Sequence, residues 1–165
     1  MRINIFNLYM DKDCTPVLVK ENSRNYACVQ NMSTPKSVVA IANEVFNLSK
    51  RVEEYMYMVC FNAALKPVGF FEISHGCVNE TFARPREILI RALLCGAVSI
   101  IMLHNHPSMD TPYPSKQDIV MTTNLMKVCN MIGIVCLDHI IISGNDYCSL
   151  KELDKSLFEE KHKHL

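Results

Sequence analysis

Hydrophobic residues recur along this chain with two different periods, and the period predicts which segments are strands and which are helices. Tyr55–Phe61 and Ala97–Leu103 are apolar at nearly every position, which is typical of central strands covered on both faces. Apolar residues three or four positions apart indicate one helix that begins at Pro35 and ends around Leu48–Lys50, and another over Lys116–Met131. The alternation of strands and helices predicts an α/β fold with a mixed sheet.

The remaining expected elements are shorter and are bounded by turn residues. The turn at 62–66 joins the first of these strands to a partner strand, and the two form a hairpin. Further strands are expected at 26–30, 67–74, 77–82, 134–142 and 147–150. A further helix is expected over 84–94, and a charged helix or tail over 151–164.

Composition excludes several classes of protein. The hydrophobic fraction of 49% and the charged fraction of 21% are typical of a globular domain rather than a disordered chain. Seventeen basic and seventeen acidic residues give zero formal charge, so direct nucleic-acid binding is possible but has no support from charge. No apolar stretch approaches the ~20 residues that cross a membrane, and the first residues lack the apolar core of a signal peptide. We therefore expect a cytoplasmic protein without a membrane association.

Eight cysteines are scattered singly along the chain, mostly within apolar segments. No two of them have the Cys-x-x-Cys spacing of a cysteine zinc site. We interpret them as reduced thiols that behave as small hydrophobic residues, which agrees with an intracellular location.

His104 and His106 follow an apolar strand and are two positions apart. Residues at i and i+2 of an extended segment project to the same side, so both imidazoles can converge on one metal ion. A His-x-His pair alone is weak evidence, because His162 and His164 in the charged tail have the same spacing. The position of the first pair, at the exit of a strand and before a proline-rich loop, favours a site.

Asp118 lies one turn into the helix that follows this loop. Its carboxylate can be the third ligand of a zinc ion whose fourth position is open to water, as catalytic zinc requires. Ser115 and Asp118 also match a helix capping box, in which Asp118 folds back onto the backbone of Ser115. Both interpretations of Asp118 are open from the sequence.

Three motifs closely resemble the RadC-like family of the JAMM (MPN-plus) metalloprotease superfamily, which shares the JAB domain. They are the segments 104–108 (His-Asn-His-Pro-Ser), 114–118 (Pro-Ser-Lys-Gln-Asp) and 137–142 (Leu-Asp-His-Ile-Ile-Ile). Arg84-Pro-Arg-Glu-Ile88 is similar to a helix start of the same family. The resemblance implies a single three-layer JAB/MPN-like, cytidine-deaminase-like domain over residues 33–150. We expect residues 1–32 to pack on this domain as an extension, residues 151–165 to form a helix or tail, and no helix-hairpin-helix domain like that of longer family members.

The resemblance also implies a role for each site residue. His104, His106 and Asp118 would bind Zn²⁺, and Ser115 would donate a hydrogen bond to the oxyanion. The family's general base is a glutamate just before a central strand; Glu54 matches that position and Glu53 is the close alternative.

This chain departs from the family pattern between the histidines and Ser115. Met109 stands where the family usually has glycine, and the stretch 107–114 is one residue longer. Asp138 and His139 recur in the family motif; we interpret them as a buried, hydrogen-bonded pair that supports the sheet or the metal ligands rather than as ligands themselves.

Two classes of function follow. The first is a zinc-dependent hydrolase that cleaves a peptide or isopeptide bond in an unidentified protein or peptide. The alternative is a DNA-repair-associated or mobile-element binding module in which the metal site is not catalytic. A nuclease of the His-Asn-His kind is discounted, because such nucleases spread these residues over a ββα-metal finger. The oligomeric state does not follow from the sequence.

Overall fold

The computed structural model describes residues 1–27, 29, 31–76, 83–108 and 111–158. These residues form a seven-stranded mixed sheet with the strand order β2-β1-β4-β3-β5-β6-β7. The strands are β1 (Arg2–Met10), β2 (Pro16–Asn25), β3 (Tyr55–Phe61), β4 (Pro67–His75), β5 (Ser99–Asn105), β6 (Val135–Ser143) and β7 (Asp146–Ser149). The helices are α1 (Pro35–Phe46), α2 (Pro85–Leu94), α3 (Lys116–Met131), α4 (Leu150–Leu153) and α5 (Lys155–Phe158), with a 3₁₀ turn at Leu48–Lys50.

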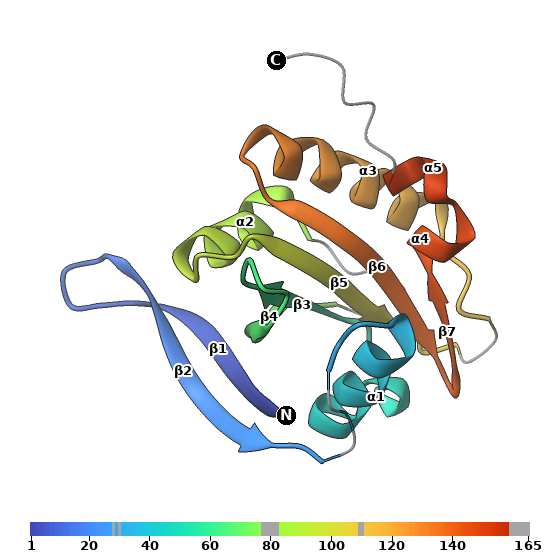
Figure 1. Ribbon diagram of the computed structural model, residues 1–165, viewed down its shortest axis with the longest axis horizontal. Helices are drawn as coiled ribbons and strands as arrows, with labels where there is room; N and C mark the ends of the chain where they lie inside the picture. The colour runs from blue at the N-terminus through green and yellow to red at the C-terminus, as the bar shows by residue number, and fades with distance from the viewer. Residues whose placement is uncertain (28, 30, 77–82, 109–110, 159–165) are drawn as a thin grey trace.

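Helices cover both faces of the central strands, which gives three layers (Figure 1). Strand β3 shows why its sequence is apolar throughout: Tyr57 and Val59 enter the core beneath α1, whereas Met56 and Met58 enter the core beneath α2 and α3. It pairs antiparallel with both β4 and β5, while β5 pairs parallel with β6. The predicted α/β fold with a mixed sheet flanked by helices is confirmed.

Several element predictions agree with the structure to within two residues. The strand over Tyr55–Phe61 and the helix over Lys116–Met131 have the predicted bounds. The predicted terminal helix is present as the short helices α4 and α5 as far as residue 158. The strand predicted at 26–30 is wrong, because β2 ends at Asn25 and residues 26, 27 and 29 belong to no strand. Residues 28 and 30 and the strand predicted at 77–82 lie outside the described residues.

The first two strands form a hairpin that extends the sheet beyond β4. Strand β1 pairs parallel with β4, with Ile5 opposite Phe70 and Phe6 opposite Phe71. Gly69 permits this approach: a Cβ atom there would lie 2.6 Å from the ring of Phe6 and 3.0 Å from the carbonyl oxygen of Asn4. The Phe6 ring is itself stacked on Phe71, at 5.5 Å between centroids.

The six cysteines in the described part of the chain are all free thiols. Cys60, Cys129 and Cys136 are buried and Cys14 is exposed. Burial raises the pKa of the Cys129 thiol to about 11, so it stays protonated at neutral pH. Among the described residues, no helix combines the length and apolar character needed to cross a bilayer.

Candidate metal centre

The end of strand β5 carries the two histidines. His104 lies within β5, and His106 continues the ladder one residue beyond it by donating its backbone N–H to Ile142 at 2.8 Å. Extended backbone therefore places both imidazoles on one side, with their Nε2 atoms 2.9 Å apart. His104 is buried, whereas the side chain of His106 is 18% exposed, so the pair opens to solvent on one side.

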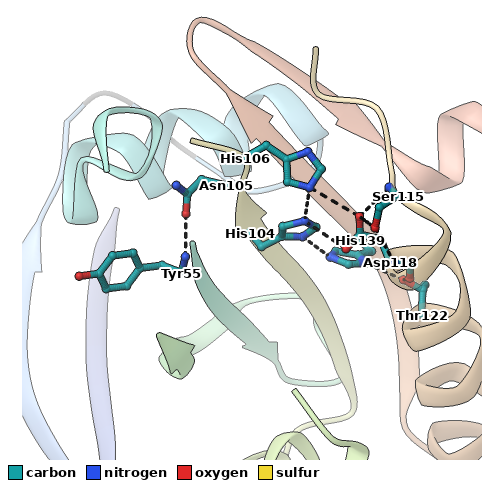
Figure 2. Close-up of polar contacts among 8 residues, drawn as sticks. All are labelled: Tyr55, His104, Asn105, His106, Ser115, Asp118, Thr122 and His139. Atoms are coloured by element: carbon teal, nitrogen blue, oxygen red, sulfur yellow. Dashed lines mark hydrogen bonds and ion pairs between the residues drawn. The ribbon is translucent and has the colours of Figure 1, made fainter. Parts of the chain in front are cut away.

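Asp118 reaches the same point from the first turn of α3 (Figure 2). Its Oδ1 atom lies 3.3 Å from His104 Nε2, and its Oδ2 atom lies 3.5 Å from His106 Nε2. One ligand atom from each residue lies within 4.8 Å of the others, so these three residues could hold a metal ion. Tetrahedral zinc with bonds of about 2.0 Å separates its ligand atoms by about 3.3 Å, which matches these spacings. Two imidazoles and one carboxylate are also ligands that zinc accepts.

The capping box at the start of α3 coexists with this arrangement. Asp118 Oδ2 accepts hydrogen bonds from the backbone N–H of Ser115 at 2.7 Å and from its hydroxyl at 2.6 Å. The N–H of Asp118 donates in return to Ser115 Oγ at 3.1 Å. The two interpretations left open by the sequence are therefore compatible, because the cap holds the carboxylate while its Oδ1 atom points to His104. The longer 107–114 loop does not separate Asp118 from the histidines; Met109 lies outside the described residues.

Behind His104, polar side chains from β6 and α3 are joined to it by hydrogen bonds (Figure 2). His139 Nε2 lies 2.8 Å from His104 Nδ1, and His139 Nδ1 lies 2.6 Å from the hydroxyl of Thr122. That hydroxyl donates to the backbone oxygen of Asp118 at 2.7 Å. Asp138 is not part of this series of hydrogen bonds. Its Oδ2 atom accepts a hydrogen bond from Ser149 Oγ at 2.6 Å. The prediction of a buried, hydrogen-bonded pair at 138–139 is confirmed: His139 contacts His104, and Asp138 accepts hydrogen bonds from His139 N–H and Ser149.

Burial controls the protonation of these groups. It lowers the pKa of His104 well below its usual value and that of His139 to about 4, so both imidazoles are neutral at pH 7. Burial alone would raise the pKa of Asp118, but hydrogen bonds from His106 and Ser115 outweigh it and lower the pKa. Neutral imidazoles and an ionised carboxylate are the protonation states in which these groups bind a metal.

The two glutamates before β3 occupy different surroundings. The carboxylate of Glu53 lies 2.5 Å from Nε2 of His75, whose ring is stacked on Tyr55 at 4.1 Å between centroids. Glu54 is half-buried, and its backbone oxygen accepts a hydrogen bond from Gly76 N–H at 2.9 Å. Glu54 therefore lies where the backbone enters the sheet, one residue before β3.

Two residues of this region were not singled out from the sequence. Thr122 lies four positions after Asp118, which places it on the same side of α3, and this spacing could have identified it. Asn105 lies between the two histidines, and its polar side chain within an apolar strand was the only indication of a special role. Its side chain binds the backbone around Glu54 (Figure 2).

The chain is similar in sequence to a known domain and to proteins of several bacteria. The profile of the RadC-like JAB domain matches residues 32–156. A UPF0758 protein of Streptococcus suis is 37% identical over 108 residues, which cover 66% of this chain and 44% of that protein. A UPF0758 protein of Clostridium tetani is 36% identical over 124 residues, covering 75% of this chain and 53% of that protein. This chain therefore spans about half the length of the curated relatives it matches.

Proposed function

Because this chain belongs to the RadC-like JAB domain family, we propose that it is a zinc-dependent hydrolase that cleaves a peptide or isopeptide bond. The observation that carries the proposal is the convergence of His104, His106 and Asp118 at one end of the sheet, with ligand atoms spaced for a tetrahedral ion. The partial exposure of His106 and Asp118 leaves one side of the cluster accessible to water and substrate. A zinc ion bound there supplies Lewis acidity, which polarises a carbonyl group and acidifies a water molecule.

Glu54 is the proposed general base. Met56 on β3 lies opposite His104 on β5, and an extended backbone continued by one more pair of residues would set Glu54 opposite His106. Side chains of directly opposite residues share a face of the sheet, and the direction alternates along each strand. Such a backbone would direct Glu54 to the face of the histidines, where its carboxylate would accept a proton from the attacking water and pass it to the leaving amine.

The contact of its carboxylate disfavours Glu53 as the base. Glu53 Oε2 lies 2.5 Å from Nε2 of His75, so this carboxylate is already engaged. The two neighbouring glutamates thus have separate roles in this proposal: Glu54 in proton transfer and Glu53 in holding the end of β4 against the start of β3.

Ser115 has two proposed tasks. Before reaction, its hydroxyl donates to Asp118 Oδ2 and holds the carboxylate toward the histidines. During reaction, a rotation about its side-chain bond would turn the hydroxyl toward the oxyanion that forms on the substrate carbonyl. The backbone N–H of Ser115 keeps Asp118 in place while the hydroxyl is turned away.

Metal analysis tests the first half of the proposal. Purified protein is expected to contain about one zinc per chain, and His104→Ala is expected to lose it. His75→Ala is the matched control, since this exposed histidine lies outside the cluster and should not change the zinc content. Protein that shows no affinity for zinc would overturn the metal site.

Hydrolysis tests the second half. The zinc-loaded protein is incubated in ¹⁸O-labelled water with a mixture of linear peptides and with peptides joined through a lysine side chain. New carboxyl termini that contain ¹⁸O are expected with the wild type and with Glu53→Gln, and should form about 100- to 10,000-fold more slowly with Glu54→Gln, which should still bind zinc. If the zinc-loaded protein cleaves neither probe and Glu54→Gln leaves the cellular phenotype intact, the binding-module alternative replaces the hydrolase.

A further inference from the structure

The residue between the two histidines is the least explained part of the site. Asn105 is only 2% exposed although it lies in a strand that is otherwise almost entirely apolar before His104. Because side chains alternate along β5, Asn105 projects to the face opposite His104 and His106 and cannot join them as a ligand. We propose that Asn105 is a positioning residue that fixes the backbone on both sides of Glu54, an inference that rests on the proposed role of Glu54 as general base.

The side-chain amide of Asn105 makes one contact on each side of Glu54. Its Oδ1 atom accepts the backbone N–H of Tyr55 at 2.9 Å, and its Nδ2 atom donates to the carbonyl oxygen of Glu53 at 3.0 Å (Figure 2 draws the first). A backbone N–H can only donate and a carbonyl can only accept, so the two contacts fix which way the amide is turned. A third, longer contact joins Nδ2 to the carbonyl oxygen of Arg51 at 3.5 Å.

The segment that Asn105 contacts, residues 51–54, has no strand hydrogen bonds of its own to hold it against β5. Residues 51–54 lie outside the strands, and Val52 is 77% exposed. Glu54 O is joined to Gly76 N–H, but that bond leads to β4 and not to the strand that carries the metal ligands. The amide of Asn105 reaches Glu53, 52 residues away in the sequence, and joins the segment directly to β5.

The three consecutive residues 104–106 therefore position both the proposed metal ligands and the proposed base. His104 and His106 direct their ligand atoms to one face of the sheet. From the other face, Asn105 forms hydrogen bonds with the peptide groups on either side of Glu54. The distance between Glu54 and the ligands then depends on the geometry of a single buried strand. A displacement of about 1 Å in a reacting group can lower a rate ~100-fold. If Glu54 is the base, losing the hydrogen bonds of Asn105 should therefore lower turnover strongly.

Asn105→Ala tests the inference with three readouts. Zinc content and affinity should be unchanged, since no ligand is touched. Hydrogen exchange of the backbone over residues 51–58 should become about 10-fold faster, because Tyr55 N–H loses its acceptor. Turnover of the peptide probe should fall about 10- to 100-fold, and by less than about 3-fold when Glu54 is already Gln, since two residues that act through one group are not additive.

Asn43→Ala is the matched control. The Oδ1 atom of Asn43 accepts the backbone N–H of Ser49 at 2.8 Å, so this variant also removes an asparagine-to-backbone tie, but one that does not flank Glu54. It should leave the exchange over 51–58 and the turnover unchanged. Asn105→Leu, which has a side chain of similar size but makes neither hydrogen bond, replaces Asn105→Ala if that variant does not fold.

Two results would overturn the inference. One is unchanged hydrogen exchange over 51–58 in a folded Asn105 variant, which decides the matter even if the wild type cleaves no probe and the proposed function fails. The other is a loss of turnover that is as large in the Glu54→Gln background as in the wild type, which would mean that Asn105 acts elsewhere.

Discussion

His139 Nε2 lies 2.8 Å from His104 Nδ1, in a contact between two buried imidazoles. The hydrogen bonds of Thr122, on the other side of His139, determine which of the two imidazoles donates. The hydroxyl of Thr122 donates to the backbone oxygen of Asp118, so it accepts from Nδ1–H of His139. Neutral His139 then has a bare Nε2 atom, which accepts from Nδ1–H of His104. His104 is left with an unprotonated Nε2 atom that faces His106 and Asp118, ready to bind a metal.

Removing His139 should therefore weaken metal binding without removing a ligand. His139→Phe keeps a ring in the core but cannot accept from His104, and we expect the zinc affinity to fall about 10- to 100-fold, as measured by competition with a chromogenic chelator. His75→Phe, at an exposed histidine, should leave the affinity unchanged. An affinity equal to that of the wild type in His139→Phe would show that the contact does not orient His104.

The metal-free protein should lose stability as the pH falls below about 6.5. Burial lowers the pKa of His139 to about 4, so between pH 4 and 6.5 the unfolded chain binds a proton that the folded chain does not. The free energy of unfolding therefore falls as the pH falls through that window, and His139 alone accounts for about 2 kcal/mol between pH 7.5 and pH 5. His104, whose pKa burial also lowers, acts in the same direction.

Urea unfolding of the chelator-treated protein at pH 7.5 and pH 5 measures this loss. His139→Phe should have the smaller difference between the two pH values, whereas Asn43→Ala, which removes no titratable group, should match the wild type. A difference that is the same in all three proteins would contradict the assignment to His139.

Ser115→Ala should separate a capping effect from a metal effect. Loss of an N-cap hydroxyl lowers the free energy of unfolding by about 1 kcal/mol, and here it also frees the carboxylate of Asp118. Thr34 caps α1 with an equivalent box, so Thr34→Ala should give a similar loss of stability. Only Ser115→Ala is expected to weaken zinc binding as well, which chelator competition and thermal unfolding together would reveal. Equal zinc affinity in the two variants would mean that the cap does not position the ligand.

Gly69→Ala should destabilise the attachment of the N-terminal hairpin. The added methyl group would meet the Phe6 ring and the backbone of Asn4, and crowding of this kind costs about 1–3 kcal/mol. Chemical denaturation measures the loss. The double variant Gly69→Ala with Phe6→Ala should be less destabilised than the sum of the two single changes, because the ring is then absent. If the two losses of unfolding free energy simply add, the added methyl group does not clash with the Phe6 ring.

The central strands and the large helices could be predicted because the order of apolar and polar residues in each of them agrees with its burial. Strand β3 is buried on both faces and α3 begins with a clear cap, so hydrophobicity and capping pointed to the same bounds. The β1–β2 hairpin gave a weaker pattern. Ile3 and Ile5 alternate with polar residues, but a register shift between Ile5 and Phe6 interrupts the period, and β2 has no buried residue.

In the candidate site, too, the features set by neighbouring residues could be predicted, and those set by contacts between residues far apart in the sequence could not. His104 and His106 converge because of strand alternation, and Asp118 is placed by a local cap, so their spacing in the sequence was informative. The choice between Glu53 and Glu54 depends on the register of β3 against β5, which no local pattern contains. The partners of Asn105 are about fifty residues away and are backbone atoms, so no residue type identifies them.

The capping box of α3 also has a consequence for how fast a metal can enter. Since Ser115 and the helix backbone hold the carboxylate of Asp118, and β5 holds both imidazoles, the ligands are assembled by the fold itself. Metal uptake by the apo-protein is then a simple bimolecular encounter: its observed rate constant rises linearly with zinc concentration and does not level off at a folding step.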